Sequence, residues 1–148
     1  MDNYVELQSQ YGLPSYEDLD HYFEITSIEE GVFLRQVRKK IAEKFEGIAT
    51  HLQDILNPDA SPSSMGESSF FDDNQKERIY SLFKSLMVFI RKSSLLSIED
   101  SDELNAQYIN EAFSFFIEHK EEFKQIFEHI QTSWKQDLNK SERIHYLG

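Results

Sequence analysis

Residues 67–147 read ESSFFDDNQKERIYSLFKSLMVFIRKSSLLSIEDSDELNAQYINEAFSFFIEHKEEFKQIFEHIQTSWKQDLNKSERIHYL and contain neither glycine nor proline. These are the two residue types that most often end a helix or turn a strand. Along the same stretch the apolar residues recur at steps of three and four, which is the spacing of one helical face. The stretch therefore predicts long helices, and we assign the chain to the all-α class.

The last of these expected helices covers residues 102–138. From Leu104 to Ile117 apolar residues surround it, which is typical of a central helix. A fully polar segment, 118–122, separates that half from a narrow stripe that reaches Trp134. A straight helix of this length would span about 55 Å, whereas a compact globule of this size measures about 40 Å across. We therefore expect an elongated bundle, a bend near 118–122, or an end that protrudes toward a partner.

Working toward the N-terminus, two further long helices are predicted. Residues 28–57 carry a clear amphipathic stripe that follows a capping-box spacing at Ser27 and Glu30. The stripe runs through Leu34, Val37, Ile41, Phe45, Ile48, Leu52 and Ile55. The next helix is capped by one of the polar residues 72–74, and residues 93–101 follow it as a polar break. Its stripe contains Ile79, Leu82, Phe83, Leu86, Phe89 and Ile90.

These segments predict a single elongated helical bundle in one domain, 1–148, with one short N-terminal helix and three long ones. The short helix begins after Ser15 as its cap and stops near Ile25. Residues 58–69 hold five serines and two prolines, and we predict a mobile loop there. The polar tail 139–148 is expected to fray.

Composition sets further limits on function. The chain has 148 residues, no cysteine and a net charge of −12. Lack of cysteine excludes disulfides and thiolate metal sites and suits a reducing compartment. No window is long and apolar enough for a membrane span, and Met1–Gln10 lacks the basic start and apolar run of a signal peptide. We therefore expect a cytoplasmic protein that does not contact membranes.

The motifs of catalysis and metal binding are missing from the sequence. A carboxylate-bridged di-metal bundle needs paired Glu-x-x-His motifs, and only Glu142 and His145 have that spacing. No nucleophile elbow and no glycine-rich phosphate loop occurs. We therefore predict no catalytic residue, no metal and no cofactor, although two carboxyl groups with shifted pKa values would escape such a search. Any small-molecule ligand stays unspecified.

A basic cluster is the most concrete candidate surface. It consists of Arg35, Arg38, Lys39, Lys40 and Lys44, and three of these share one side of the expected second helix. We assign these residues to partner binding, with an acidic protein or a phosphate group as the partner.

Two considerations weigh against a free basic cluster. Residues 1–34 contain eight acids and no Lys or Arg, so this segment could fold across the cluster and neutralise it. The acids best placed to do so are Glu17, Asp18, Asp20 and Glu24. A strongly acidic chain is also repelled by nucleic-acid backbones, so nucleic acid is a weaker alternative partner.

Trp134 is the second candidate for partner binding, because it lies on the narrow distal stripe and tryptophan often anchors interfaces. Docking on the long helix expected over 28–57 is the alternative role for it. The leading hypothesis is a non-enzymatic interaction or scaffold module that binds a protein partner or itself, for instance as a homodimer. The alternative is an enzyme or small-molecule binder with a pocket between helices.

Overall fold

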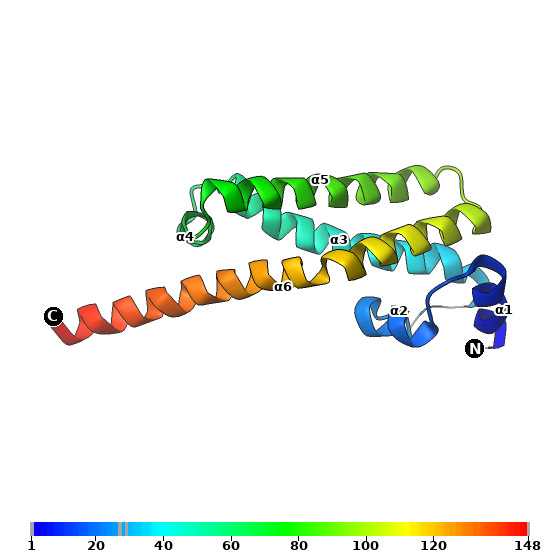
Figure 1. The fold of residues 1–148 in the computed structure, drawn as a ribbon, viewed down its shortest axis with the longest axis horizontal. Coiled ribbons are helices and arrows are strands. Elements are labelled where there is room, and N and C mark those ends of the chain that lie inside the picture. The colour runs from blue at the N-terminus through cyan, green and yellow to red at the C-terminus, as the bar shows by residue number, and fades with distance from the viewer. Residues whose placement is uncertain (1, 27, 29, 148) are drawn as a thin grey trace. The chain divides into compact units, whose positions relative to one another are not determined.

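The computed structural model describes the backbone of residues 2–26, 28 and 30–147, and the side chains of these residues except Asp2, Glu30 and 137–147. Across the described residues the fold is all-helical, with 84% helix and no strand (Figure 1). Its elements are α1 (Asp2–Tyr11), α2 (Tyr16–Phe23), a 3₁₀ turn η1 (Glu30–Val32), α3 (Phe33–Leu56), α4 (Pro62–Ser69), α5 (Asp73–Leu96) and α6 (Asp102–Leu147). The all-α class is thereby confirmed.

The predicted number of helices is wrong, because six α-helices are present in the described part of the chain where four were expected. The first addition is α1. Gly12, with a φ of +63°, follows its last residue, and the amide of Leu13 donates to the carbonyl oxygen of Gln8 at 3.2 Å. This bond closes the helix end as a Schellman motif. Tyr4 of α1 and Leu13, which follows the helix, are both buried, and this burial holds α1 in place.

The second addition is α4, which corrects the loop predicted over 58–69. Ser61 caps this helix by accepting from the amide of Ser64 at 3.2 Å, and Pro62 occupies the first turn. The hydroxyl of Ser68 donates to the carbonyl oxygen of Ile55 at 2.7 Å, and the hydroxyl of Ser64 donates to the carbonyl oxygen of Asp54 at 3.4 Å. The last carbonyls of a helix lack intrahelical donors, so these serines satisfy the end of α3. The mobility of 58–69 stays a prediction.

Ser15 caps α2 as predicted, and this helix ends at Phe23, two residues before the expected Ile25. Helix α3 begins at Phe33, later than the expected residue 28, and α6 extends to Leu147, beyond the expected residue 138. Capping by Ser27 lies outside the described residues. Helix α5 extends through Leu96, so the break before α6 is shorter than the expected 93–101. Helix α6 is continuous across 118–122, since polar side chains leave the backbone hydrogen bonds of a helix intact. A bend there and fraying of 139–148 stay predictions.

The chain divides into two compact units. Unit 1 comprises Met1–Ala49 and Lys84–Glu118, and its core is rich in aromatic rings. Phe45 is fully buried there and its ring contacts those of Phe23, Phe89, Phe115 and Phe116. The members of the α3 stripe within unit 1 are all buried, as predicted: Leu34, Val37, Ile41, Phe45 and Ile48.

Unit 2 comprises Thr50–Phe83 and His119–Gly148. Its buried apolar residues come from the end of α3, the short segment between α4 and α5, the first half of α5, and α6. They are Leu52, Ile55, Phe71, Ile79, Leu82 and Phe123. Phe83, a member of the predicted stripe on α5, and Ile130 of α6 are half-buried.

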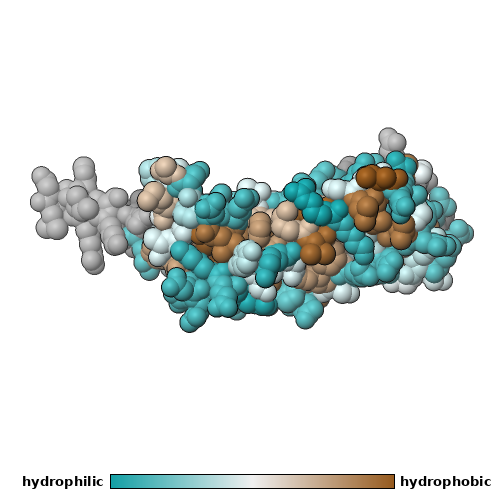
Figure 2. Space-filling model, turned by 90° about the horizontal axis from the view of Figure 1, so that it is seen from above, coloured by the Kyte–Doolittle hydropathy of each residue, from teal (hydrophilic) through white to brown (hydrophobic). Residues whose placement is uncertain are grey.

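Several large apolar side chains remain exposed. Figure 2 looks onto the side where α5 lies and shows hydrophobic patches between hydrophilic residues. On α5 and the turn after it, Val88, Leu95 and Ile98 have exposed fractions of 66%, 59% and 83%. In the part of the chain that the structure describes, none of the helices combines the length and apolarity that crossing a membrane requires.

Candidate functional site

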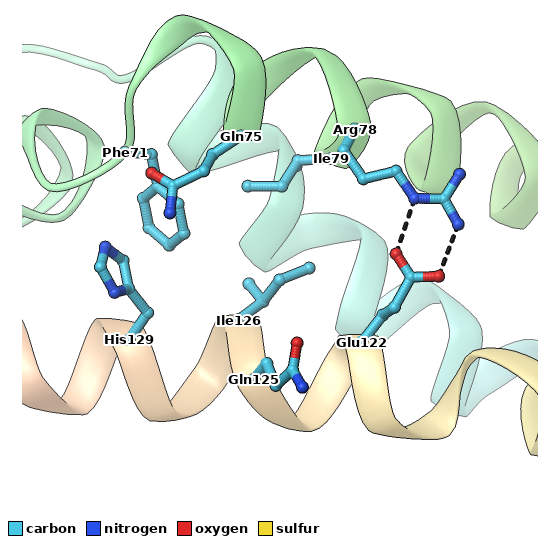
Figure 3. A pocket seen from close by; sticks show the side chains of 8 residues that line it. All are labelled: Phe71, Gln75, Arg78, Ile79, Glu122, Gln125, Ile126 and His129. Carbon is cyan, nitrogen blue, oxygen red and sulfur yellow. Dashed lines mark hydrogen bonds and ion pairs between the residues drawn. The ribbon is translucent and has the colours of Figure 1, made fainter.

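A surface pocket of about 270 Å³ lies in unit 2 between α5 and α6 (Figure 3). Helix α5 contributes Gln75, Arg78 and Ile79. Helix α6 contributes Glu122, Gln125, Ile126 and His129, and Phe71 closes the end next to α4. On α6, Glu122 and Ile126 are four residues apart, as are Gln125 and His129, so these side chains share one helical face.

The start of α5 fixes one rim of this pocket. The amide of Gln75 donates to the Asp72 carboxylate at 2.7 Å, and the amide of Asp72 donates to the Gln75 side-chain oxygen at 2.8 Å. This reciprocal pair is a capping box. It holds the Gln75 side chain in place and orients the first turn of α5, from which Arg78 and Ile79 follow.

A bidentate ion pair forms the opposite end. Nε of Arg78 donates to Oε2 of Glu122 at 2.6 Å, and Nη2 donates to Oε1. His119, one turn earlier on α6, has its Nδ1 at 3.1 Å from the same Oε1. The Arg78 guanidinium, assisted by His119, lowers the pKa of the Glu122 carboxyl to about 2, and the same bond raises the pKa of Arg78.

His129 stands at the other end of the pocket, beside Phe71 (Figure 3). Its Nε2 lies 2.6 Å from the carbonyl oxygen of Phe70, and its ring meets that of Phe71 edge-on, with 4.6 Å between centroids. A backbone carbonyl can only accept, so Nε2 carries the proton and, in the neutral ring, Nδ1 is the acceptor. This bond ties α6 to the segment that follows α4.

The chemistry of the pocket suits binding better than proton transfer. Phe71 and Ile79 are buried and form an apolar floor with the half-buried Ile126. A general base needs a pKa near the working pH, yet the carboxyl group of Glu122 is shifted the other way. Arg78 and Glu122 bond one another, while Gln75 bonds Asp72 and His129 bonds the carbonyl oxygen of Phe70, so these polar groups frame an apolar hollow. Such a hollow can receive an apolar group.

The structure separates the five residues of the predicted basic cluster. Arg38 is fully buried in unit 1, where Nη1 donates to the carbonyl and hydroxyl oxygens of Ser93 and to the hydroxyl of Ser97. Arg38 therefore cannot belong to an exposed basic face. Arg35 pairs with Asp100, with 3.0 Å between Nε and Oδ2. Lys39 is exposed.

The remaining two lysines lie beside the end of α2. Lys44 donates to the carbonyl oxygen of Tyr22 at 2.6 Å, and its ammonium lies 5.5 Å from the Phe116 ring centroid. Lys40 lies 3.9 Å from Glu43 and, together with Lys44, lines a pocket that includes Glu24. The acidic segment thus approaches this end of the cluster, with a main-chain oxygen as the contact to Lys44. The Asp20 carboxylate instead accepts the amides of Ile25 and Thr26.

Trp134 lies on α6 in unit 2 and is 45% exposed. Its indole Nε1 donates to Oε2 of Glu67 on α4 at 2.7 Å. This bond joins the indole to α4, whereas docking on the long helix that is now α3 was the alternative we considered. Its binding role stays a prediction.

The residues of the α5–α6 pocket were missed in the sequence. The Asp72 and Gln75 capping box was readable, but no local pattern pairs Arg78 with Glu122, which lie on different helices.

Glu142 and His145 lie outside the residues whose side chains are described. Among the described residues, no group of three or more His, Cys, Asp or Glu side chains is arranged to hold a metal ion.

The chain matches no model of a known protein family, no curated protein and no solved structure.

Proposed function

We propose that the protein is a non-enzymatic interaction module that seats an apolar side chain of a partner protein in the α5–α6 pocket of unit 2. One observation carries the proposal: an apolar floor of Phe71, Ile79 and Ile126 opens to the surface inside a polar rim. Protein interfaces combine an apolar centre with a polar rim in the same way. Arginine and tryptophan are enriched among the residues that dominate binding energy, and Arg78 and the exposed Trp134 belong to the same unit.

The charge of the chain narrows the class of partner. A net charge of −12 attracts basic chains over long range and repels acidic ones. Within the pocket, Arg78 and Glu122 neutralise one another. We therefore expect a partner segment that presents one large apolar residue flanked by Lys or Arg.

Size argues for a single side chain over a drug-sized free ligand. Small-molecule pockets span about 300–1,000 Å³, and this pocket, at about 270 Å³, falls just below that range. A small-molecule binder remains the alternative, with the same pocket as its site. Nothing favours the phosphate alternative at 35–44, because Arg38 is inside the core.

Selection of peptides from a random display library on the folded protein tests the proposal. Gln125→Trp fills the pocket mouth and should weaken the selected peptides at least about tenfold. Lys124→Trp is the matched control, because Lys124 is exposed on the same helix but does not line the pocket; it should leave affinity unchanged. Failure to select any peptide, or equal loss in both variants, would contradict the proposal. Small fragments that bind while peptides do not would favour the alternative.

Self-association is a second candidate, favoured by the exposed apolar residues of α5. Val88 and Leu95 lie two helical turns apart on one face, and Ile98 follows just beyond the helix. Light scattering over a range of protein concentrations should then show a dimer that Leu95→Glu dissociates. A monomer at all concentrations would remove this candidate. Small-angle X-ray scattering would test the associated expectation of one elongated helical domain.

A further inference from the structure

Another pocket, independent of the proposed partner site, lies in unit 1 among α1, α2 and the start of α3. It has a volume of about 230 Å³. Its seven lining residues are Asn3, Tyr4 and Leu7 of α1, Tyr16 of α2, Thr26, Ile28, and Phe33 of α3. Three of these seven side chains are aromatic, two are aliphatic and two are polar.

The three rings are set at different angles. Tyr4 stands steeply to Phe33, with 5.4 Å between centroids and 64° between planes, and to Tyr16, with 5.6 Å and 69°. Tyr16 and Phe33 are close to parallel, at 21° and 6.2 Å. The Tyr4 hydroxyl donates to the carbonyl oxygen of Pro14, and burial raises the pKa of this phenol to about 12, so it stays neutral. Tyr4 thus offers the pocket its ring.

Electrostatics around this pocket favour a positive ligand. Aromatic faces carry partial negative charge and attract cations that lie within about 6 Å of the ring centroid. Residues 1–34, which supply all of the lining, hold eight acids and no Lys or Arg, although none of the lining residues is itself charged. The first basic residue, Arg35, is paired with Asp100. A cation therefore meets π-surface within a segment whose sequence is acidic.

We propose that this pocket binds a quaternary ammonium group, of the kind carried by choline or by a trimethylated lysine side chain. Three N-methyl groups can pack against Leu7, Ile28 and the rings without needing hydrogen-bond acceptors. A primary ammonium carries three N–H donors, for which the lining offers only Asn3 and Thr26 besides the tyrosine hydroxyls, so it would recover part of its lost hydration. Binding of this group adds a recognition activity to the chain that the α5–α6 pocket does not provide.

Titration of the full chain with choline tests the proposal against dimethylbutanol, the neutral isostere in which carbon replaces the nitrogen. Choline should bind about tenfold more tightly by calorimetry, because the isostere keeps the shape and loses the charge. Amide shifts in ¹H–¹⁵N spectra should be confined to α1, α2 and the start of α3. A trimethyl-lysine peptide, titrated in parallel, identifies whether the stronger ligand is a modified protein or a free choline group.

Three variants locate the binding. Tyr16→Leu removes one ring and should weaken choline binding about tenfold, whereas Tyr16→Phe keeps the ring and the affinity. Tyr11→Leu removes a tyrosine of α1 that does not line the pocket and should bind as the wild type does. Equal affinity for choline and its isostere, or no saturable binding of choline, would overturn the proposal. So would unchanged binding by a folded Tyr16→Leu chain. If that variant unfolds, the comparison of the two ligands on the unaltered chain decides.

Discussion

Nη1 of Arg38 donates to both the carbonyl oxygen and the hydroxyl oxygen of Ser93, a residue 55 positions later in the chain. Ser93 lies in the last turn of α5, and its carbonyl oxygen also accepts the amide and the hydroxyl of Ser97, each at 3.1 Å. A positive charge at this end also complements the helix dipole. Arg38 therefore acts as a buried cap that joins α3 to the C-terminal end of α5 within unit 1.

Replacement of Arg38 should reveal how much this cap contributes. Arg38→Ala leaves a large cavity and removes the bonds of Nη1 to Ser93 and Ser97, so we expect a loss of about 3 kcal/mol in urea unfolding. Arg38→Met fills more of the volume and avoids burying a charge, so its loss should be smaller. Lys39→Ala, at the exposed neighbouring position, is the control and should change stability by less than about 0.5 kcal/mol. Equal effects at the two positions would show that the cap contributes nothing.

The serines of α4 should contribute measurable stability to unit 2. Ser68→Ala leaves the buried carbonyl oxygen of Ile55 without its donor, and we expect a cost of about 1 kcal/mol. Hydrogen exchange at the amides of α4 should become faster in the same variant. Ser69→Ala, an exposed serine of the same helix, is the control. If exchange and stability in Ser68→Ala match those of Ser69→Ala, α4 is not held through this bond.

The ion pair at the pocket rim should give a pH-dependent contribution. The pKa of Glu122 falls from an ordinary value of 4.5 to about 2 on folding, so the ionised form stabilises the fold. Its contribution is complete above about pH 5 and is lost as the pH falls through the folded pKa. Because both side chains are substantially exposed, we expect it to stay below about 1 kcal/mol.

Urea unfolding of the wild type and of Glu122→Gln at a series of pH values measures this contribution. The stability difference between them should be largest near neutral pH and should vanish toward pH 2. Glu121→Gln, which removes the same charge from the adjacent exposed position, is the control. A difference that grows as the pH falls would reverse the sign that we derive.

The Trp134 indole gives unit 2 a spectroscopic probe, since it is the one tryptophan of the chain. Glu67→Ala removes the acceptor of its N–H, so the ring should become more hydrated and its fluorescence should shift to longer wavelength. The stability cost should stay below about 1 kcal/mol because the pair is exposed. Glu121→Ala should leave the emission unchanged. Identical spectra for Glu67→Ala and the wild type would place the indole elsewhere.

The fold was predictable wherever one helical face carries the information. The α3 stripe from Leu34 to Ile55 is buried as expected, and the Ser15 cap lies where its spacing indicates. Helix α4 was missed because serine and proline together resemble a loop in sequence. Its serines instead bond carbonyl oxygens of α3, a long-range contact that composition does not record.

The candidate sites were less predictable, for the same reason. Arg38 is basic like its neighbours in the sequence, yet it is buried and donates hydrogen bonds to the hydroxyls of Ser93 and Ser97. The pairing of Arg78 with Glu122 depends on how α5 and α6 pack, and neither residue stands out locally. For the pocket in unit 1, the sequence shows the aromatic residues but not their arrangement. Tyr4, Tyr16 and Phe33 were visible in the sequence, but only the fold places them around one pocket.

The most direct test of the interaction proposal is a ¹H–¹⁵N chemical-shift map of the full chain with a selected basic-apolar peptide. We predict saturable shifts confined to amides near 71–79 and 122–129, with a corresponding loss in Gln125→Trp and none in Lys124→Trp. Shifts centred on other residues, or shifts that persist in Gln125→Trp, would contradict a partner site between α5 and α6.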